Sequence, residues 1–216
     1  MTLIKAAVCR EFGKPLVIEE VELLPPNYGE VQVKLGACSI CHSDILYAEG
    51  AWGGDLPAVY GHEAAGVVSD VGDGVTNVKA GDHVLVTLIR SCGKCHYCSQ
   101  GDKVQCDSVF PLDEHSPLRT SEGELIAHGL RTAAFAESVV VDSSQLAHIP
   151  KEIPLDSASV LSCGVITGFG AVVNTAKIQS GCCVVVLGTG GVGLNSVQGA
   201  SISGAERIIA LDLSDE

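Results

Sequence analysis

Four cysteines lie close together at the spacing C-x2-C-x2-C-x7-C: Cys92, Cys95, Cys98 and Cys106. Four thiolates fill the tetrahedral shell of Zn2+ completely, so the set predicts a structural zinc site with no position left for a substrate. A free zinc ribbon that binds nucleic acid or protein is the other interpretation of this spacing. The formal net charge of −13 disfavours the nucleic-acid version, because nucleic acid requires a basic surface.

A second, scattered set of candidate ligands consists of Cys41, His62 with Glu63 beside it, and Cys163. Three protein ligands leave one zinc position open for water or substrate, which is the arrangement of a catalytic site. These residues are too far apart in the sequence for spacing alone to show that they meet. The segments C-H-S-D at 41–44 and G-H-E at 61–63 are what single the set out.

A glycine-rich turn, G-T-G-G-V-G, supplies Gly188, Gly190, Gly191 and Gly193 after an apolar run, and Asp212 closes the next apolar run. In this context the glycines permit a tight turn and a close approach of backbone amides to a pyrophosphate at a helix N-terminus. The acidic residue lies roughly 20 residues further on, where it can accept hydrogen bonds from a ribose and repel a 2′-phosphate. The pattern predicts dinucleotide binding and favours NAD over NADP.

Composition limits the classes of function. The 216 residues suffice for one large domain or two smaller ones, and 25 glycines with 4% aromatic residues suit a strand-rich α/β protein. The acidic charge argues against nucleic acid and anionic membranes as partners. Most of the ten cysteines lie at metal-ligand spacings and the N-terminus has no apolar signal core, which predicts a reducing, cytoplasmic setting.

The elements that must position these residues change in character near Pro150. Before it, strands are expected at 1–8, 16–22, 30–37, 64–71, 82–87 and 136–141, with 39–49 as the one plausible short helix. Turns every 8–12 residues predict a β-barrel or sandwich. After it, 154–176 has a helical pattern, and 184–187, 190–204 and 207–211 predict a strand, a helix and a second buried strand of a parallel sheet.

Together these motifs resemble the zinc-dependent medium-chain alcohol dehydrogenases, and 171–212 is especially similar to the classes that include glutathione-dependent formaldehyde dehydrogenase. The resemblance covers essentially the whole chain. It implies a mixed α/β fold: a GroES-like β-barrel catalytic domain at 1–153 with a structural zinc lobe at 91–107, then, at 154–216, a linking helix region and the first β-α-β of a Rossmann domain, a doubly wound parallel sheet. Since such proteins continue well beyond Glu216, the chain is expected to be C-terminally truncated and, by itself, inactive.

The resemblance also implies two zinc ions per chain, NAD as the cofactor, a small alcohol or aldehyde as substrate, and a homo-oligomer, dimer or tetramer, for the full-length form. Catalytic zinc would be held by Cys41, His62 and Cys163, with Glu63 a carboxylate able to approach it. Asp44 would orient His62, and Ser43 would take the alcohol proton. His42 would contact the pyrophosphate, and the nicotinamide would be contacted by Thr167 and Val192.

Two departures from the family pattern bear on this function. Many relatives have a histidine three residues after the proton-accepting Ser or Thr, where this chain has Leu46, so the last step of proton transfer must differ or go directly to water. The segment between Cys106 and Phe135 does not closely match the glutathione-dependent class. An S-(hydroxymethyl)glutathione dehydrogenase is therefore an alternative, and a non-enzymatic zinc and nucleotide-binding module is an alternative of another class.

Overall fold

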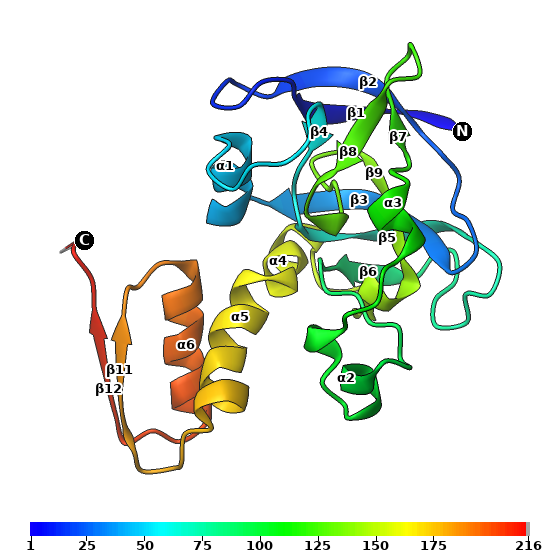
Figure 1. Cartoon of the computed structure of the whole chain (residues 1–216). Helices are drawn as coiled ribbons and strands as arrows, with labels where there is room; N and C mark the ends of the chain where they lie inside the picture. The colour runs from blue at the N-terminus through cyan, green and yellow to red at the C-terminus, as the bar shows by residue number, and fades with distance from the viewer. Residues whose placement is uncertain (215–216) are drawn as a thin grey trace. The chain divides into compact units, whose positions relative to one another are not determined.

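The computed structural model of the chain describes residues 1–214, and its contacts divide the chain into two compact units, Met1–Val160 and Leu161–Glu216. The division falls a little further along the chain than the boundary expected after residue 153. Figure 1 shows a first unit rich in strands and a second unit that combines helices with a small sheet.

The first unit is built around a closed barrel and a five-stranded sheet (Figure 1). The barrel has the order β1-β2-β7-β8-β4 and the sheet the order β10-β6-β5-β3-β9. The strands are β1 (Thr2–Cys9), β2 (Val17–Leu23), β3 (Glu30–Ser39), β4 (Ala58–Val59), β5 (Glu63–Val71), β6 (His83–Val86), β7 (Leu118–Arg119), β8 (Leu125–His128), β9 (Ser138–Asp142) and β10 (Leu146–His148).

Short helices connect these strands: α1 (His42–Ala48), α2 (His96–Ser99), α3 (Pro111–Glu114) and α4 (Leu155–Ser159), with 3-10 turns at Lys103–Gln105, Gly129–Arg131, Ser143–Gln145 and Val160–Ser162. The expected strands and the helix α1 are confirmed. The expectation of a single short helix before residue 150 is wrong, because α2 and α3 are also present. Each has only four residues, which is too short to produce a helical period in the sequence.

Alternation of buried and exposed residues explains how the sheet forms. Val31 and Val33 of β3 are fully buried, and they pack with Val139 and Val141 of β9 in one core cluster. Strand β3 pairs antiparallel with β5, and the register ends at Ser39 opposite Glu63. In this register, the segment that follows β3 lies beside the segment that precedes β5. Cys41 belongs to the first segment and His62 to the second, so the two residues are neighbours.

The second unit contains α5 (Gly164–Gly170), a π-helical turn (Ala171–Ala176), β11 (Cys183–Leu187), α6 (Gly191–Ile202) and β12 (Arg207–Leu211). Strands β11 and β12 pair in parallel with α6 between them in sequence, as predicted. The helical pattern expected over 154–176 is formed as several short helical segments. It is interrupted at Cys163, whose φ of −144° and ψ of −69° are not helical, and α5 begins at the next residue.

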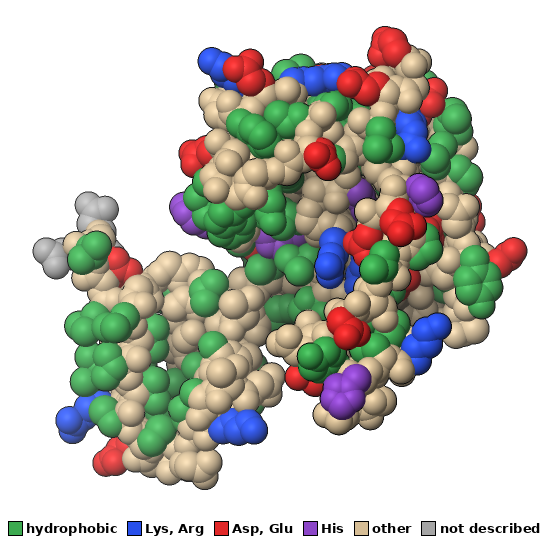
Figure 2. Space-filling model, viewed as in Figure 1, with side chains coloured by type: hydrophobic (Ala, Val, Ile, Leu, Met, Phe, Trp, Pro, Cys, Tyr) green, Lys and Arg blue, Asp and Glu red, His purple; other side chains and the backbone are tan. Residues whose placement is uncertain are grey.

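Several apolar side chains of the two-stranded sheet are exposed. The side chains with the largest exposure are Val185 at 55%, Leu187 at 78% and Leu211 at 51%. Figure 2 shows hydrophobic side chains gathered over β11 and β12. Among residues 1–214, no single helix has the length and apolar character needed to cross a membrane, although the bent pair Leu155–Ser162 and Gly164–Ala176 meets those criteria jointly.

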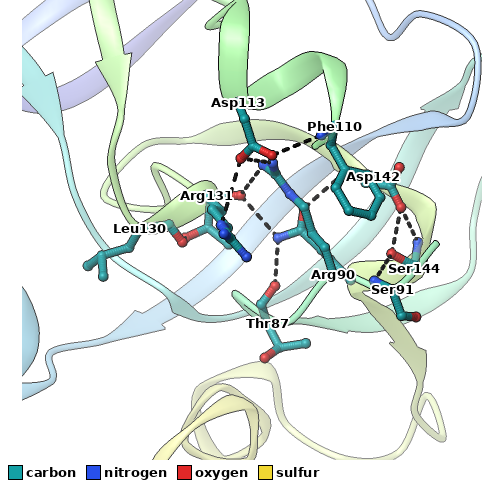
Figure 3. A network of polar contacts seen from close by, with 11 residues as sticks. Thr87, Arg90, Ser91, Phe110, Asp113, Leu130, Arg131, Asp142 and Ser144 are labelled. Atoms are coloured by element: carbon teal, nitrogen blue, oxygen red, sulfur yellow. Dashed lines mark hydrogen bonds and ion pairs between the residues drawn. The ribbon is translucent and has the colours of Figure 1, made fainter. Parts of the chain in front are cut away.

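A buried arginine, two residues before the first lobe cysteine, joins α3 to the 3-10 turns at Gly129–Arg131 and Ser143–Gln145 (Figure 3). The Arg90 side chain is fully buried, and burial lowers the pKa of its guanidinium. It donates to Gln145 Oε1 at 2.8 Å, to Asp113 Oδ1 at 2.6 Å and to the Arg131 carbonyl at 3.0 Å, and its guanidinium lies 5.7 Å from the Phe110 ring centroid. A buried charge with this many partners fixes the segments that it joins.

Replacing Arg90 by methionine should therefore destabilise the first unit. The change removes one donor each from Asp113 Oδ1, Gln145 Oε1 and the Arg131 carbonyl, and breaking a buried ion pair costs about 3–5 kcal/mol. Urea unfolding of the variant should show this loss. The matched control is Arg10→Met, because Arg10 pairs with Glu19 at the surface and its loss should cost less than about 1 kcal/mol. Equal effects of the two substitutions would contradict the role given to Arg90.

Candidate metal and nucleotide sites

The four lobe cysteines form a compact cluster. The sulfur atoms of Cys92, Cys95, Cys98 and Cys106 all lie within 4.8 Å of one another. Backbone amides point at the sulfurs: Cys95 N lies 3.2 Å from Cys92 Sγ, and Cys98 N lies 3.4 Å from Cys95 Sγ. Such N–H···S contacts stabilise thiolates and orient them as ligands. The cluster fits a closed, four-sulfur zinc site.

The lobe favours negative charge on some of its sulfurs before any metal is considered. A hydrogen bond from the Ser108 side chain is the largest cause that lowers the pKa of Cys92 to about 6. Backbone hydrogen bonding from Cys92 lowers the pKa of Cys106. Burial instead raises the pKa of Cys98 to about 12. A divalent cation would remove this imbalance, since coordination deprotonates a thiol outright.

The second candidate site is organised by the buried carboxylate of Asp44, which is 2% exposed. Its Oδ2 accepts from the backbone N–H of Cys41 at 2.9 Å. Its Oδ1 accepts from the backbone N–H of Gly61 at 3.0 Å and lies 2.9 Å from Nδ1 of His62. One carboxylate therefore holds two of the predicted ligands. Because a carboxylate only accepts, Nδ1 of His62 carries the proton and Nε2 carries the lone pair.

The structure brings Cys41, His62 and Glu63 together: their ligand atoms lie within 4.8 Å of one another. His62 and Glu63 are buried, and Cys41 is half-buried. The mixture of thiol, imidazole and carboxylate donors suits Zn2+. Cys163 belongs to the second unit, where it precedes α5 and its Sγ lies 3.8 Å from Thr167 Oγ1. Its participation in this site stays a prediction.

Helix α1 carries the other residues predicted to act near the metal. His42 is exposed at its first position, Ser43 is half-buried beside Asp44, and Leu46 is half-buried one turn further on. Asp44 also closes the N-terminus of this helix, because its side chain accepts from the backbone of Cys41, the N-cap residue. The sequence places a ligand, a hydroxyl and an orienting carboxylate within one turn.

The glycine turn of the second unit has the features of a dinucleotide cradle. Gly188 has a φ of +93°, and a Cβ at Gly193 would lie on the Gly188 carbonyl, so both positions require glycine. At Gly190 and Gly191 a Cβ would meet nothing within 4 Å, which leaves open space before the N-terminus of the 12-residue helix α6. A phosphate fits there, because backbone amides and the positive helix dipole face it.

Asp212 lies at the carboxyl end of β12 and faces this turn. It accepts from the backbone N–H of Thr189 and from the Thr189 hydroxyl, the latter at 2.8 Å, and from Leu213 N at 2.7 Å. These hydrogen bonds, that from the Thr189 backbone first, lower the pKa of Asp212 to about 2. A cavity of about 380 Å3 opens between the ends of β11 and β12 beside Asp212. An ionised carboxylate is therefore held where a ribose could enter.

The predicted nicotinamide contacts, Thr167 and Val192, lie on the adjacent helices α5 and α6. Gly168 permits the close approach, since a Cβ there would lie 2.2 Å from the Val192 carbonyl. The Ser196 hydroxyl also donates to the Gly168 carbonyl at 3.1 Å. Both Thr167 and Val192 are exposed on this surface, so they are accessible to a ligand of the second unit.

Sequence reasoning missed several residues that shape these sites. Thr189 stands at a variable position of the glycine motif, and its position next to Gly188 was the only signal. Gly61 was part of the G-H-E segment, but its contact with Asp44 was not predicted. Thr132 and Gln145 gave no pattern at all, because their roles depend on contacts between segments far apart in the chain. Arg90 stood two residues before the first lobe cysteine, a proximity that indicated a link to the lobe but not its partners.

Comparisons with known proteins show similarity over nearly the whole chain. The alcohol dehydrogenase GroES-like domain matches residues 27–151. Alcohol dehydrogenase 1 of Pisum sativum is 42% identical over 217 residues, and alcohol dehydrogenase class-P of Arabidopsis thaliana is 43% identical over 220 residues. The alignments cover 97% and 98% of this chain but 57% and 58% of those proteins. The chain thus spans little more than half the length of these relatives.

Solved structures show the same likeness. An alcohol dehydrogenase zinc-binding domain protein from Burkholderia ambifaria superposes with a TM-score of 0.93 at 36% identity, covering 99% of this chain and 60% of that one. Benzyl alcohol dehydrogenase from Acinetobacter calcoaceticus superposes with a TM-score of 0.91 at 29% identity, covering 100% and 60%. The predicted fold class, a GroES-like barrel followed by the start of a Rossmann sheet, is confirmed.

Replacing Asp44 by asparagine should weaken metal binding at the Cys41–His62 site by about 10–100-fold, the usual effect of losing an orienting partner. The three groups around the carboxylate are N–H donors, and the amide NH2 would face at least one of them. A chelator competition titration measures the effect. Asp142→Asn is the matched control, since Asp142 binds Ser144 instead and should leave metal affinity unchanged. Unchanged affinity in the Asp44 variant would refute its orienting role.

Proposed function

Because the chain belongs to the alcohol dehydrogenase GroES-like domain family, we propose that it is a zinc-dependent alcohol dehydrogenase, which transfers a hydride between a primary or secondary alcohol and NAD. The observation that carries the proposal is the pair of ligands, Cys41 and His62, held by the Asp44 carboxylate in the same unit as a complete four-cysteine cluster. Of two such sites, the closed one would hold a metal that stabilises the fold, and the open one would hold a metal that can bind the substrate.

Two metal sites of different function follow from the donor sets. Cys92, Cys95, Cys98 and Cys106 would hold a structural zinc. Cys41, His62 and Cys163 would hold the catalytic zinc, with Glu63 as a carboxylate able to approach it. When bound, zinc supplies Lewis-acid polarisation of the alcohol oxygen and NAD supplies the hydride acceptor. The remaining chemistry falls to the side chains of the chain.

Proton transfer begins at Ser43, whose half-buried hydroxyl lies one residue from Asp44 and two from Cys41. It would take the alcohol proton. Leu46 cannot pass a proton on, so the Ser43 proton would leave directly to water. Asp44 keeps the proton on Nδ1 of His62 and so keeps the ligand in one tautomer.

Cofactor binding would use the second unit and one residue of α1. Gly188, Gly190, Gly191 and Gly193 would admit the pyrophosphate, with His42 as a basic group against it. Asp212 would accept from the adenosine ribose and repel a 2′-phosphate, which selects NAD. Thr167 and Val192 would contact the nicotinamide.

Further properties are also proposals. The substrate class is a small alcohol or aldehyde, and turnover that required glutathione would identify the S-(hydroxymethyl)glutathione variant instead. We expect a homo-oligomer, dimer or tetramer, and neither nucleic acid nor membrane as a partner. Most of the ten cysteines lie at proposed metal-ligand positions, which favours a reducing compartment such as the cytoplasm.

The metal assignment predicts opposite phenotypes for two cysteine substitutions in the full-length protein, which should contain two zinc ions per chain. Cys163→Ser should lose one zinc and nearly all turnover while the unfolding midpoint changes little. Cys95→Ser should lose the other zinc and lower the unfolding midpoint, because the lobe loses a closed shell. Elemental analysis, thermal unfolding and alcohol oxidation measure these effects. Two zinc ions and full activity in Cys163→Ser would exclude Cys163 as a ligand.

The cofactor assignment predicts that Asp212→Gly lowers NAD affinity roughly tenfold or more, as expected from losing a charge-assisted hydrogen bond of about 1.5–3 kcal/mol. NADP affinity should rise, because a negative charge near its 2′-phosphate is removed. Calorimetric titration of both cofactors measures the change. Glu206→Gln is the control, since Glu206 is an exposed acid before the opposite end of β12. Equal NAD affinity in wild type and Asp212→Gly would show that Asp212 does not meet the ribose.

A further inference from the structure

A strained turn precedes β9 in the first unit. Leu130, Arg131 and Ala133 all have left-handed backbone angles, with φ of 52°, 63° and 51°. Residues with a Cβ rarely adopt this conformation, and it persists only where the surroundings enforce it. Strain of this kind is common where a backbone must present one group in a fixed direction.

Buried side chains hold the turn from one side. The Arg131 carbonyl accepts from Arg90 Nη2 at 3.0 Å and from Gln145 Nε2 at 3.0 Å. Figure 3 shows Arg90 beside Arg131, with Thr87 and Asp113 completing the network. Both Arg90 and Gln145 are almost wholly buried. The left-handed conformation of Arg131 is therefore fixed by two donors that cannot exchange with water.

On its other side the turn meets the peptide group that precedes His62. Thr132 is fully buried, and its hydroxyl donates to the Gly61 carbonyl at 2.6 Å. The N–H of Gly61 donates to Asp44 Oδ1, the same oxygen that faces Nδ1 of His62. Gly61 itself cannot be replaced, because its φ is +94° and a Cβ would lie 2.6 Å from the Phe135 backbone nitrogen.

The Thr132 hydroxyl is not needed to satisfy the Gly61 carbonyl. The backbone N–H of Ala134 already donates to that carbonyl at 3.0 Å. A carbonyl oxygen that already accepts one hydrogen bond gains little further compensation for its burial from a second donor. The second donor instead fixes the direction of the C=O bond. The plane of the Gly61–His62 peptide, and with it the starting direction of the imidazole, is thereby determined.

We infer that Thr132 is a positioning residue for the metal ligand His62, and that Arg90 and Gln145 hold the strained turn that presents it. The inference rests on the proposed function, because it requires that His62 bind a metal. The turn then has a role in the metal site. His62 is aligned through its backbone by Thr132 and through its ring by Asp44.

The test compares Thr132→Val, which has the same shape without the hydroxyl, with Thr132→Ser, which keeps it. Both are prepared as full-length protein with Co2+ at the catalytic site and zinc in the lobe. In Thr132→Val we expect a shifted visible Co2+ spectrum, metal release to a chelator about tenfold faster, and a lower kcat with an unchanged KM for NAD. Thr132→Ser should restore all three.

Ser116→Ala is the matched control, because this buried hydroxyl donates to the Ile126 carbonyl away from the site and should leave spectrum and release rate unchanged. A wild-type spectrum and release rate in Thr132→Val, or failure of Thr132→Ser to restore them, would overturn the inference while leaving the proposed function intact. If wild-type protein took up Co2+ only in the lobe, the proposed function would be refuted and the inference with it.

Discussion

The hydrogen bonds of the Asp44 carboxylate are the constraint on which the candidate catalytic site depends. They join the start of α1 to the start of β5, because Oδ2 binds Cys41 and Oδ1 binds Gly61 and faces His62. A buried carboxylate is costly unless it is fully hydrogen-bonded. Here its partners are the backbone N–H of Gly61, which precedes His62, the imidazole of His62 itself, and the backbone N–H of Cys41. The hydrogen bonds that compensate for burial of the carboxylate are therefore the same ones that align the two ligands.

The rest of the first unit serves to keep that arrangement rigid. The register between β3 and β5 brings the two ligand segments together, and the Leu130–Ala133 turn braces the peptide before His62. Arg90 connects this brace to the segment that begins the cysteine lobe. The segment before the lobe and the candidate catalytic site are thus linked through the hydrogen bonds of Arg90, Thr132 and Asp44.

The second unit follows a different principle, since its functional groups lie on open backbone rather than in a buried network. Glycines at 190 and 191 leave space that side chains would occupy, and Asp212 remains ionised at the surface because Thr189 donates to it. A dinucleotide would be held there by amides and one charge, so the proposed role of the unit requires shape and polarity more than burial. In the candidate metal site of the first unit, by contrast, His62 and Glu63 are buried.

The sequence by itself determined the lobe, the glycine turn, Asp212 and the β-rich first unit, because each depends on local spacing or alternation. It also determined the long strands β1, β3 and β5. Only the tertiary structure decided the interruption at Cys163, the two-residue strands β4 and β7, and the roles of Thr132, Gln145 and Arg90. These features rest on contacts between segments far apart in the chain: Arg90 and Gln145 are 55 residues apart, and Thr132 and Gly61 are 71 apart. No local period records such pairs, since the geometry that joins them exists only when the barrel has closed.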